Sequence, residues 1–272
     1  MTVSTLSADP DVDPVSQVFM ALTRPRRRPA SPEQVQALSG ATRLAVDHRG
    51  TALAAWAWGE GAPVLLLHGW ESRASHMAAF APALVQAGFR AIALDAPAHG
   101  ESPGEVTDVV DYGTAVAAVA ARFGPLAAVI AHSLGSAAAL HAYAHGVRVQ
   151  ASVQLCGPAS LARVLQRGGA SAGLGATDIA RIEAMMVERL GAPLSVMDLS
   201  SLRHGMLHPA LILHDPDDPE LPASESHALA EAWSRSTLSP VAGVGHRRIL
   251  RDPSVISAAV RFITDATTSP TR

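Results

Sequence analysis

Residues 126–145 read LAAVIAHSLGSAAALHAYAH, and this stretch decides the fold. The uninterrupted apolar run at 126–131 predicts a buried strand, and residues 134–145 have the composition of a helix that ends at Gly146. Ser133 lies at the turn between them. A sharp turn from strand to helix strains the backbone of such a serine and exposes its hydroxyl, beside the free N–H groups of the helix that follows.

The turn Ala131-His132-Ser133-Leu134-Gly135 has the pattern G-x-S-x-G with alanine in the first position. A bulky side chain two residues before or after the serine would collide with neighbouring backbone, and alanine is still small enough. Five residues are a weak signal, because a serine at this place can also simply cap a helix. The interpretation therefore depends on the flanking strand and helix and on partners of Ser133 elsewhere in the chain.

Short apolar runs alternate with helical patterns along most of the chain. The runs predict eight strands, at residues 42–46, 53–58, 64–67, 90–94, 126–131, 149–155, 210–213 and 237–241. Helices are predicted at 75–87, 108–123, 134–145, 178–190, 223–233 and 253–262. This alternation indicates an α/β fold with a mostly parallel eight-stranded sheet and helices on both faces, in which ligands bind at the carboxyl ends of the strands.

The alternation of predicted strands and helices is interrupted once, and this interruption determines the predicted domain organisation. Residues 158–208 are predicted to form a helical lid, with a loose glycine-rich loop at 168–175. The lid divides the core into a first part at 42–157 and a second part at 209–265. An N-terminal extension (1–41) and a C-terminal tail (266–272) complete the chain, and we expect residues 1–14 and 266–272 to be polar and loose.

The composition indicates a globular protein, since 48% of the 272 residues are hydrophobic and 17% are charged. The net charge of −3 gives no strong overall field toward nucleic acid or an anionic membrane, so we expect a small-molecule substrate. All 21 basic residues are arginine, which excludes Schiff-base chemistry on lysine and the lysine of phosphate-binding loops. The single cysteine, Cys156, excludes an internal disulfide and a multi-cysteine zinc site, and it favours a reducing cytoplasm.

We expect neither an export signal nor a membrane-spanning segment in this sequence. Its first 14 residues hold three aspartates and no basic residue, unlike a signal peptide. The longest apolar stretch, at 115–131, is interrupted by Arg122 and Gly124-Pro125, and a membrane helix needs about 20 apolar residues. The one basic cluster, RPRRRP at 24–29, could contact an anionic partner, but a solvated turn is the simpler interpretation.

Two polar segments follow later strands of the predicted sheet. Residues 214–219 (HDPDDP) come after the strand at 210–213, and residues 243–248 (GVGHRR) come after the strand at 237–241. Both segments lie at the sheet edge where the serine turn also lies. A serine nucleophile needs a histidine to take its proton and a carboxylate to orient that histidine. The second segment offers His246, and the first offers a choice of three aspartates.

Over roughly residues 42–263 the sequence resembles the α/β-hydrolase family. The matching pieces are LHGW at 67–70, DAPAHGES at 95–102, the serine turn, the aspartate segment and Gly245-His246. The resemblance implies an α/β-hydrolase fold and a catalytic triad of Ser133, Asp218 and His246. The position of the acid in the family selects Asp218, which leaves Asp215 as a turn residue and Asp217 facing solvent.

The resemblance also implies an oxyanion hole, formed by the backbone N–H groups of Leu134 and Trp70. Gly69 would allow the loop of Trp70 to approach the serine closely. The ring of Trp70 either forms a wall of the acyl pocket or simply packs. Glu71 could recognise a substrate cation, although a surface salt bridge between Glu71 and Arg73 is the simpler interpretation.

Three further histidines receive structural interpretations. We expect His68 to order its loop by hydrogen bonding and His99 to be a turn residue. His132 precedes Ser133 directly, and alternation along the strand predicts that its side chain points elsewhere.

The leading interpretation is a serine hydrolase that cleaves a carboxylic ester through an acyl-enzyme, with no cofactor and no metal. Amide, peptide or thioester hydrolysis, C–C bond hydrolysis and acyl transfer need the same groups and stay open. Serine at position 133 argues against epoxide hydrolases and dehalogenases, which use aspartate. A non-catalytic ligand receptor on this fold would lack part of the triad or of the oxyanion hole. Residues 168–173 (GGASAG) superficially resemble a dinucleotide fingerprint, but they follow a helix rather than a strand.

Overall fold

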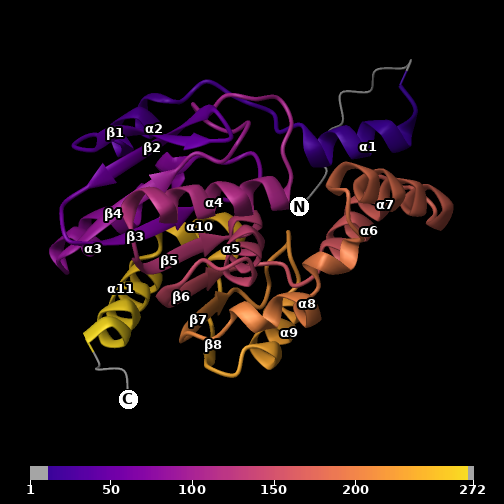
Figure 1. Cartoon of the computed structure of the whole chain (residues 1–272). Coiled ribbons are helices and arrows are strands. Elements are labelled where there is room, and N and C mark those ends of the chain that lie inside the picture. The colour runs from indigo at the N-terminus through magenta and orange to yellow at the C-terminus, as the bar shows by residue number, and fades with distance from the viewer. Residues whose placement is uncertain (1–11, 269–272) are drawn as a thin grey trace.

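A single eight-stranded sheet forms the centre of the computed structural model, which describes residues 12–268 (Figure 1). The strands are β1 (Thr42–His48), β2 (Thr51–Trp58), β3 (Ala62–Leu67), β4 (Phe89–Leu94), β5 (Leu126–His132), β6 (Val149–Leu155), β7 (Ala210–His214) and β8 (Ser236–Pro240). Their order is β1-β2-β4-β3-β5-β6-β7-β8. Only the pairs β1–β2 and β2–β4 are antiparallel. All eight predicted strands are present, so the prediction of a mostly parallel sheet is confirmed.

Helices cover both faces of the sheet, as predicted (Figure 1). One face packs against α4 (Val109–Phe123), α5 (Leu134–Ala144), α8 (Leu199–Leu202) and α9 (Ser224–Ala232), and the other against α3 (Ala81–Gln86) and α11 (Pro253–Thr268). The other helices are α1 (Pro14–Thr23), α2 (Pro32–Ala37), α6 (Leu161–Ser171), α7 (Ala176–Leu190) and α10 (Gly245–Arg248). Five 3-10 turns, at Ala74–His76, Ala78–Phe80, Leu194–Met197, Arg203–Gly205 and Ile249–Arg251, complete the described elements.

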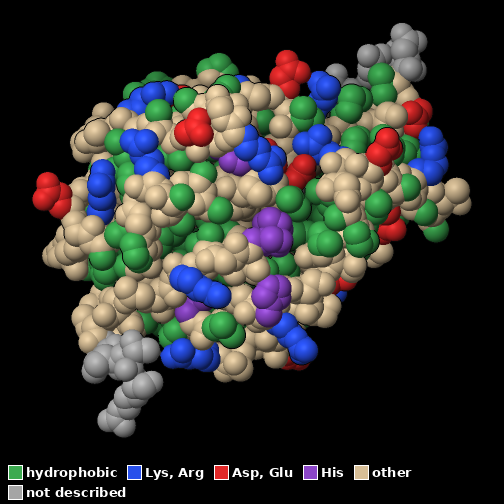
Figure 2. All heavy atoms as spheres, in the orientation of Figure 1, with side chains coloured by type: hydrophobic (Ala, Val, Ile, Leu, Met, Phe, Trp, Pro, Cys, Tyr) green, Lys and Arg blue, Asp and Glu red, His purple; other side chains and the backbone are tan. Residues whose placement is uncertain are grey.

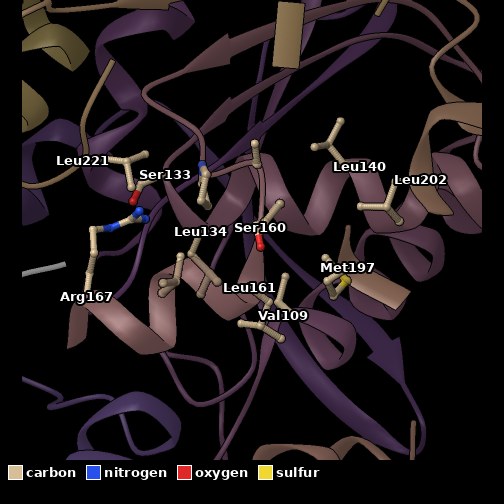
Figure 3. Close-up of a pocket in the computed structure, with 14 residues that line it drawn as sticks. Val109, Ser133, Leu134, Leu140, Ser160, Leu161, Arg167, Met197, Leu202 and Leu221 are labelled. Atoms are coloured by element: carbon tan, nitrogen blue, oxygen red, sulfur yellow. The ribbon is translucent and has the colours of Figure 1, made fainter. Parts of the chain in front are cut away.

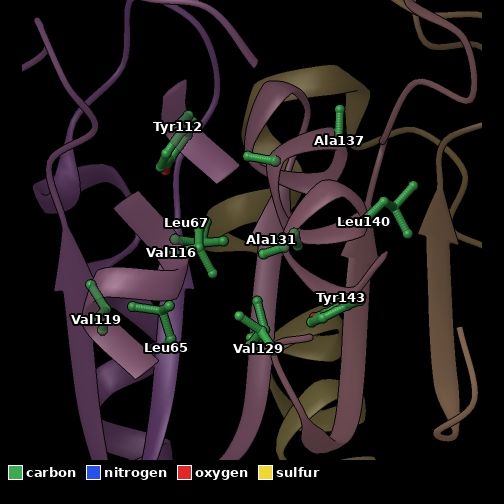
Figure 4. Close-up of a cluster of buried hydrophobic side chains, with 14 of the residues drawn as sticks. Leu65, Leu67, Tyr112, Val116, Val119, Val129, Ala131, Ala137, Leu140 and Tyr143 are labelled. Atoms are coloured by element: carbon green, nitrogen blue, oxygen red, sulfur yellow. The ribbon is translucent and has the colours of Figure 1, made fainter. Parts of the chain in front are cut away.

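The hydrophobic core has two layers because successive strand side chains point to opposite faces. In β3, Leu65 and Leu67 belong to the layer beneath α4 and α5, whereas Val64 and Leu66 belong to the layer beneath α3 and α11. Figure 4 shows the first layer, in which side chains of α4 and α5 pack on β3 and β5. Burial of each large apolar side chain contributes about 1.5–3 kcal/mol, so this two-sided packing determines which way every strand faces.

The helix predicted at 75–87 is wrong in its first half. Two 3-10 turns stand there instead, and the α-helix begins only at Ala81. Pro82 explains the restart, because it has no N–H to continue an α-helix from the preceding turn.

The loose loop predicted at 168–175 is also wrong, since α6 continues through Gly168 and Gly169 to Ser171. A Cβ on Gly169 would lie 2.7 Å from a side-chain carbon of Ile179 on α7. The glycine therefore serves the close packing of two helices rather than loop flexibility. Together α6, α7 and α8 form the helical part of the segment between β6 and β7.

The N-terminal extension is more ordered than the sequence indicates. Residues 1–11 of the predicted loose start lie outside the described residues, and α1 begins at Pro14, where the Asp13 side chain accepts backbone hydrogen bonds as the N-cap. Helix α1 lies beside α6 and α7 (Figure 1). Its buried side chains pack on these two helices in a small core that comprises Val15, Val18, Leu22, Leu165, Ile182 and Met186.

The C-terminal helix is longer than predicted. The segment expected to end at residue 262 continues through Thr268 as α11, so the tail predicted at 266–272 is helical as far as it is described. Within residues 12–268, none of the helices combines the length and the apolarity needed to cross a membrane.

Candidate active site

Ser133 occupies the turn between β5 and α5 with a positive φ of 52°. This conformation costs a residue with a side chain about 1–3 kcal/mol. The backbone N–H of Ser133 donates to the Leu155 carbonyl (2.9 Å), which holds the turn in place. A Cβ on Gly135 would lie 2.7 Å from the carbonyl oxygen of His68, so only glycine fits there, as the steric pattern predicts.

Strained backbone gathers at one edge of the sheet. Five non-glycine residues have positive φ in the described chain, and four of them follow the carboxyl ends of β3 to β6: Glu71, Ala98, Ser133 and Cys156. Strain of this kind persists where the surrounding structure holds it, and it is concentrated at functional sites. The edge that the sequence predicts for ligand binding is thus the edge where the backbone is strained.

The imidazole of His246 is held by a carboxylate. Its Nδ1–H donates to Oδ2 of Asp218 (2.6 Å), while Oδ1 of Asp218 accepts the backbone N–H groups of Glu220 (2.8 Å) and Leu221 (3.1 Å). Burial opposes ionisation of Asp218, but hydrogen bonds from His214 and His246 keep its pKa well below its ordinary value. Because Nδ1 carries the proton, Nε2 of neutral His246 is the acceptor.

The other two aspartates of this segment differ from Asp218. Asp215 is buried and accepts the N–H groups of Asp217 (3.0 Å) and Gly245 (2.5 Å), so it joins the turn after β7 to the loop that carries His246. The Asp217 side chain is exposed, in agreement with the sequence-based expectation.

Ser133 and His246 line one cavity of about 740 Å³. Seven arginines also line it, and we call it the arginine cavity: Arg26, Arg27, Arg28, Arg73, Arg247, Arg248 and Arg251. The three predicted triad residues are thus together at one sheet edge, with the carboxylate of Asp218 behind the imidazole of His246.

The loop after β3 approaches the serine closely. A Cβ on Gly69 would lie 2.9 Å from the Cβ of Ser133, so glycine is required by contact. Trp70 follows and lines the arginine cavity, with its ring edge-on to His99 at 5.1 Å between centroids. Leu134 is the first residue of α5, so its N–H has no acceptor within the helix.

Two neutral histidines tie this loop to the loop after β4. His68 donates from Nδ1 to the Gly69 carbonyl (2.7 Å) and accepts the Ala96 N–H at Nε2 (3.1 Å). His99 accepts the Glu71 N–H at Nε2 (3.1 Å). Burial lowers the pKa of His68 well below its ordinary value and that of His99 to about 4, so both stay neutral and keep these roles. The structural role predicted for both is confirmed.

The strand pattern predicts that the side chain of His132 points away from Ser133, and this prediction is wrong. His132 lines the arginine cavity with Ser133, its ring lies 4.8 Å from the ring of His246, and its Nε2–H donates to the His246 carbonyl (2.8 Å). Burial, and then the charge of His246, lower the pKa of His132 to about 3. His132 is still paired with Leu155 at the end of β5, so its side chain follows the alternation of the strand, and the loop of His246 lies against it. The sequence holds no other signal for this contact.

A second, narrow pocket of about 40 Å³ meets the arginine cavity at Ser133. Its lining is mostly apolar; Figure 3 labels Val109, Leu134, Leu140, Leu161, Met197, Leu202 and Leu221. Arg167 of α6 is its charged exception, and Figure 3 shows the guanidinium at the Ser133 end. Nη1 of Arg167 donates to buried Glu225 (2.7 Å), which also binds Arg163 (2.8 Å). The sequence did not indicate these residues, because no motif connects α6 with Glu225.

A second serine–histidine pair lines the arginine cavity. Nδ1 of His76 lies 2.7 Å from Oγ of Ser72, and Nε2 of His76 lies 2.7 Å from the amide nitrogen of Gln34. The amide nitrogen is a donor, so Nε2 accepts and Nδ1 carries the proton. His76 therefore donates to Ser72 and cannot take its proton.

Cys156, Asp218 and His246 place one potential metal ligand each within 4.8 Å of one another. Burial, and then the negative charge of Asp218, raise the pKa of the Cys156 thiol far above its ordinary value. A protonated thiol is a poor metal ligand, and the other two groups already bind each other. The donor set thus fits a buried histidine–carboxylate pair better than a metal site.

The salt bridge expected between Glu71 and Arg73 is wrong. Glu71 forms a bidentate salt bridge with Arg26 (2.8 Å for both bonds), and Arg73 instead donates to the Arg28 carbonyl (2.9 Å). The arginines of the basic cluster at 24–29 are exposed, as a solvated turn predicts, and three of them also line the arginine cavity.

Comparison with known proteins agrees with this architecture. Residues 64–259 match the model of the alpha/beta hydrolase family. No curated protein matches the chain in sequence. The esterase Pf2001 of Pyrococcus furiosus superposes with a TM-score of 0.69 at 18% identity, over 89% of this chain and 98% of that one.

Two further solved structures have the same fold. Est816, described as an N-acyl homoserine lactone degrading enzyme, gives a TM-score of 0.63 at 16% identity, over 80% of this chain and 99% of its own. The putative non-heme bromoperoxidase BpoC of Mycobacterium tuberculosis gives 0.64 at 17% identity, over 83% and 98%. Because the family model spans most of the chain and the sheet, helices and strained serine turn agree with it, this protein belongs to the alpha/beta hydrolase family and is a hydrolase.

Proposed function

We propose that the protein is a serine hydrolase that cleaves a carboxylic ester, with Ser133 as nucleophile, His246 as general base and Asp218 as the orienting acid. The observation that carries the proposal is the 2.6 Å hydrogen bond between His246 and Asp218, at a cavity that strained Ser133 also lines. The fold shared with an esterase and a lactone-degrading enzyme is in keeping with an ester substrate.

The reaction takes place in two steps. Oγ of Ser133 bonds to the ester carbonyl carbon while Nε2 of His246 takes the hydroxyl proton. The N–H groups of Trp70 and Leu134 stabilise the oxyanion, and loss of one such donor typically costs about 3 kcal/mol of barrier. The bond from the carbonyl carbon to the alcohol oxygen breaks, and His246 returns the proton to that oxygen.

Water then completes the cycle. His246 takes a proton from the water as it attacks the acyl carbon, and the bond to Oγ of Ser133 breaks. The proton passes to Oγ, so the products are one alcohol and one carboxylic acid and the enzyme is regenerated. Ionised Asp218 holds the neutral imidazole in the tautomer that accepts at Nε2, and it stabilises the imidazolium that forms in each step.

The experiment that tests this proposal combines hydrolysis of p-nitrophenyl acetate with labelling by a fluorophosphonate probe. Ser133→Ala is expected to lower kcat by at least roughly 10⁴-fold and to abolish labelling. Ser72→Ala is the matched control, because this hydroxyl lies in the same cavity and also contacts a histidine. It should still be labelled. Labelling that persists in folded Ser133→Ala protein, verified by circular dichroism, would place the nucleophile elsewhere.

A further inference from the structure

The arginine cavity contains far more positive than negative charge. Seven of the 21 arginines of the chain line it, against two glutamates, Glu71 and Glu220. The whole chain has a net charge of −3, and on the face that Figure 2 shows, basic and acidic side chains are scattered without a continuous patch of either sign. The excess of positive charge around Ser133 is therefore local to this cavity and does not follow from the overall charge of the chain.

Most of these arginines are not neutralised by a carboxylate. Glu71 binds Arg26 (2.8 Å) and Glu220 binds Arg247 (2.8 Å). Within residues 12–268, the other five have no carboxylate oxygen within 4.0 Å: Arg27, Arg28, Arg73, Arg248 and Arg251. Their hydrogen bonds go to backbone carbonyls, as for Arg27 with Gly100 (2.8 Å) and Arg248 with Gly243 (3.0 Å), and a carbonyl leaves the charge in place.

A titratable group inside the cavity responds to this charge. His76 lines the cavity, and burial followed by the charges of Arg251, Arg73 and Arg247 lowers its pKa to about 4. A neutral His76 adds no further positive charge at neutral pH. The same field that disfavours an imidazolium favours a bound anion.

The position of His246 indicates which part of an ester substrate, the alcohol or the acyl group, lies in the arginine cavity and which lies in the narrow pocket. His246 lines the arginine cavity and is absent from the lining of the narrow pocket, while Ser133 lines both. In the proposed reaction His246 protonates the departing alcohol, so the alcohol must lie on its side of Ser133. The acyl group then lies in the narrow pocket, whose volume of about 40 Å³ and apolar lining suit a short chain.

We propose that the substrate is an ester of a short apolar acid with an alcohol that carries phosphate or carboxylate groups, and that the arginine cavity binds this anionic alcohol. The inference rests on the proposed function. Arginine is suited to the role because its planar guanidinium binds both groups in a bidentate manner. Cleavage breaks the bond between the carbonyl carbon and the alcohol oxygen. The alcohol leaves with a proton on this oxygen, and its phosphate or carboxylate group keeps its negative charge.

The test compares three acetate esters with the same acyl group: neutral phenyl acetate, 4-acetoxybenzoate and 4-acetoxyphenyl phosphate. The measured quantity is the ratio of kcat/KM for each anionic ester to kcat/KM for phenyl acetate, so that effects on the chemical step cancel. Arg28→Gln and Arg251→Gln should each lower this ratio by about tenfold or more, the value of a hydrogen bond to a charged group. A larger decrease of the ratio for the phosphate ester means that the cavity prefers a phosphate group. Equal decreases for the two anionic esters mean that a single negative charge, as on a carboxylate, is sufficient for recognition.

Arg261→Gln is the matched control, because it removes the same charge from an exposed position on α11 outside the cavity lining. Its ratio should stay within twofold of the wild-type value. Monophenyl succinate, which carries its charge on the acyl side, should show no dependence on Arg28 or Arg251. If hydrolysis of monophenyl succinate depended on Arg28 or Arg251 instead, the assignment of the alcohol to the arginine cavity and of the acyl group to the narrow pocket would be wrong.

The two proposals fail in different ways. If phenyl acetate is hydrolysed and Ser133 is labelled, but neither arginine variant changes the ratio, the anionic alcohol is wrong and the serine hydrolase stands. If Ser133 is neither labelled nor needed for phenyl acetate hydrolysis, the proposed function fails, and the inference with it.

Discussion

Two serine–histidine pairs line the arginine cavity, and they differ in the features that the proposed mechanism needs from a nucleophile and its base. Ser72 follows β3 and receives a hydrogen bond from His76, whose other ring nitrogen accepts from Gln34. Ser133 follows β5, in a strained turn directly before a helix. His246, which lines the same cavity, is bound at Nδ1 by a buried carboxylate and thus accepts at Nε2. Each pair places a hydroxyl and an imidazole in the same cavity, whereas the tautomer of the imidazole differs.

The largest effect should distinguish the two histidines. His246→Ala is expected to lower kcat for p-nitrophenyl acetate by roughly 10⁴- to 10⁶-fold, because the proton of Ser133 loses its acceptor. His76→Ala should change kcat by less than about tenfold, because His76 donates to Ser72 rather than accepting from it. Steady-state kinetics of both folded variants measures the contrast. Similar losses in the two variants would remove the distinction between the pairs.

A smaller effect is expected from the glycine in contact with Ser133. In Gly69→Ala the new methyl would lie 2.9 Å from the Cβ of Ser133 and 3.1 Å from Nδ1 of His132, so the loop carrying the Trp70 N–H must move. We expect kcat to fall by about 10²- to 10³-fold, as on loss of one oxyanion donor.

Gly175→Ala provides the control for this substitution. A Cβ there meets nothing within 4 Å, and the φ of −80° suits alanine. An unchanged kcat in Gly69→Ala, with thermal unfolding like that of Gly175→Ala, would show that the loop of Trp70 has no part in catalysis.

The smallest effect concerns stability and pH. The pKa of Asp218 is lower in the folded protein than its unfolded value of about 3.9, so its stabilising contribution is present above about pH 4 and is lost as pH falls below it. Asp218→Asn lacks this contribution, which is on the order of 1–3 kcal/mol for a hydrogen bond to a charged group. In urea unfolding, the free energy of unfolding of the wild type should exceed that of Asp218→Asn by an amount that decreases from pH 5 toward about pH 2. An advantage independent of pH would mean that ionised Asp218 adds no stability.

Local sequence patterns predicted the parts of the molecule that local forces determine. Continuous apolar runs identified inner strands such as β3, β5 and β7, because a strand buried on both faces needs apolar residues throughout. The predictions fail where packing between distant segments dominates. Gly168 and Gly169 indicate a loop but lie in a helix packed against α7, and α1 gains its partner only when the segment between β6 and β7 folds beside it.

The sequence by itself determined the sheet and the chain order of serine, acid and histidine, since apolar periodicity and turn composition act over a few residues. Only the tertiary structure decided how charges 45 to 223 residues apart meet around Ser133. It brought Arg28, Arg73 and Arg251 to one cavity and gave Glu71 its partner Arg26. Charge–charge interactions depend on distance in space rather than along the chain, so an arginine run that suggested a solvated turn also lines the cavity around the proposed nucleophile.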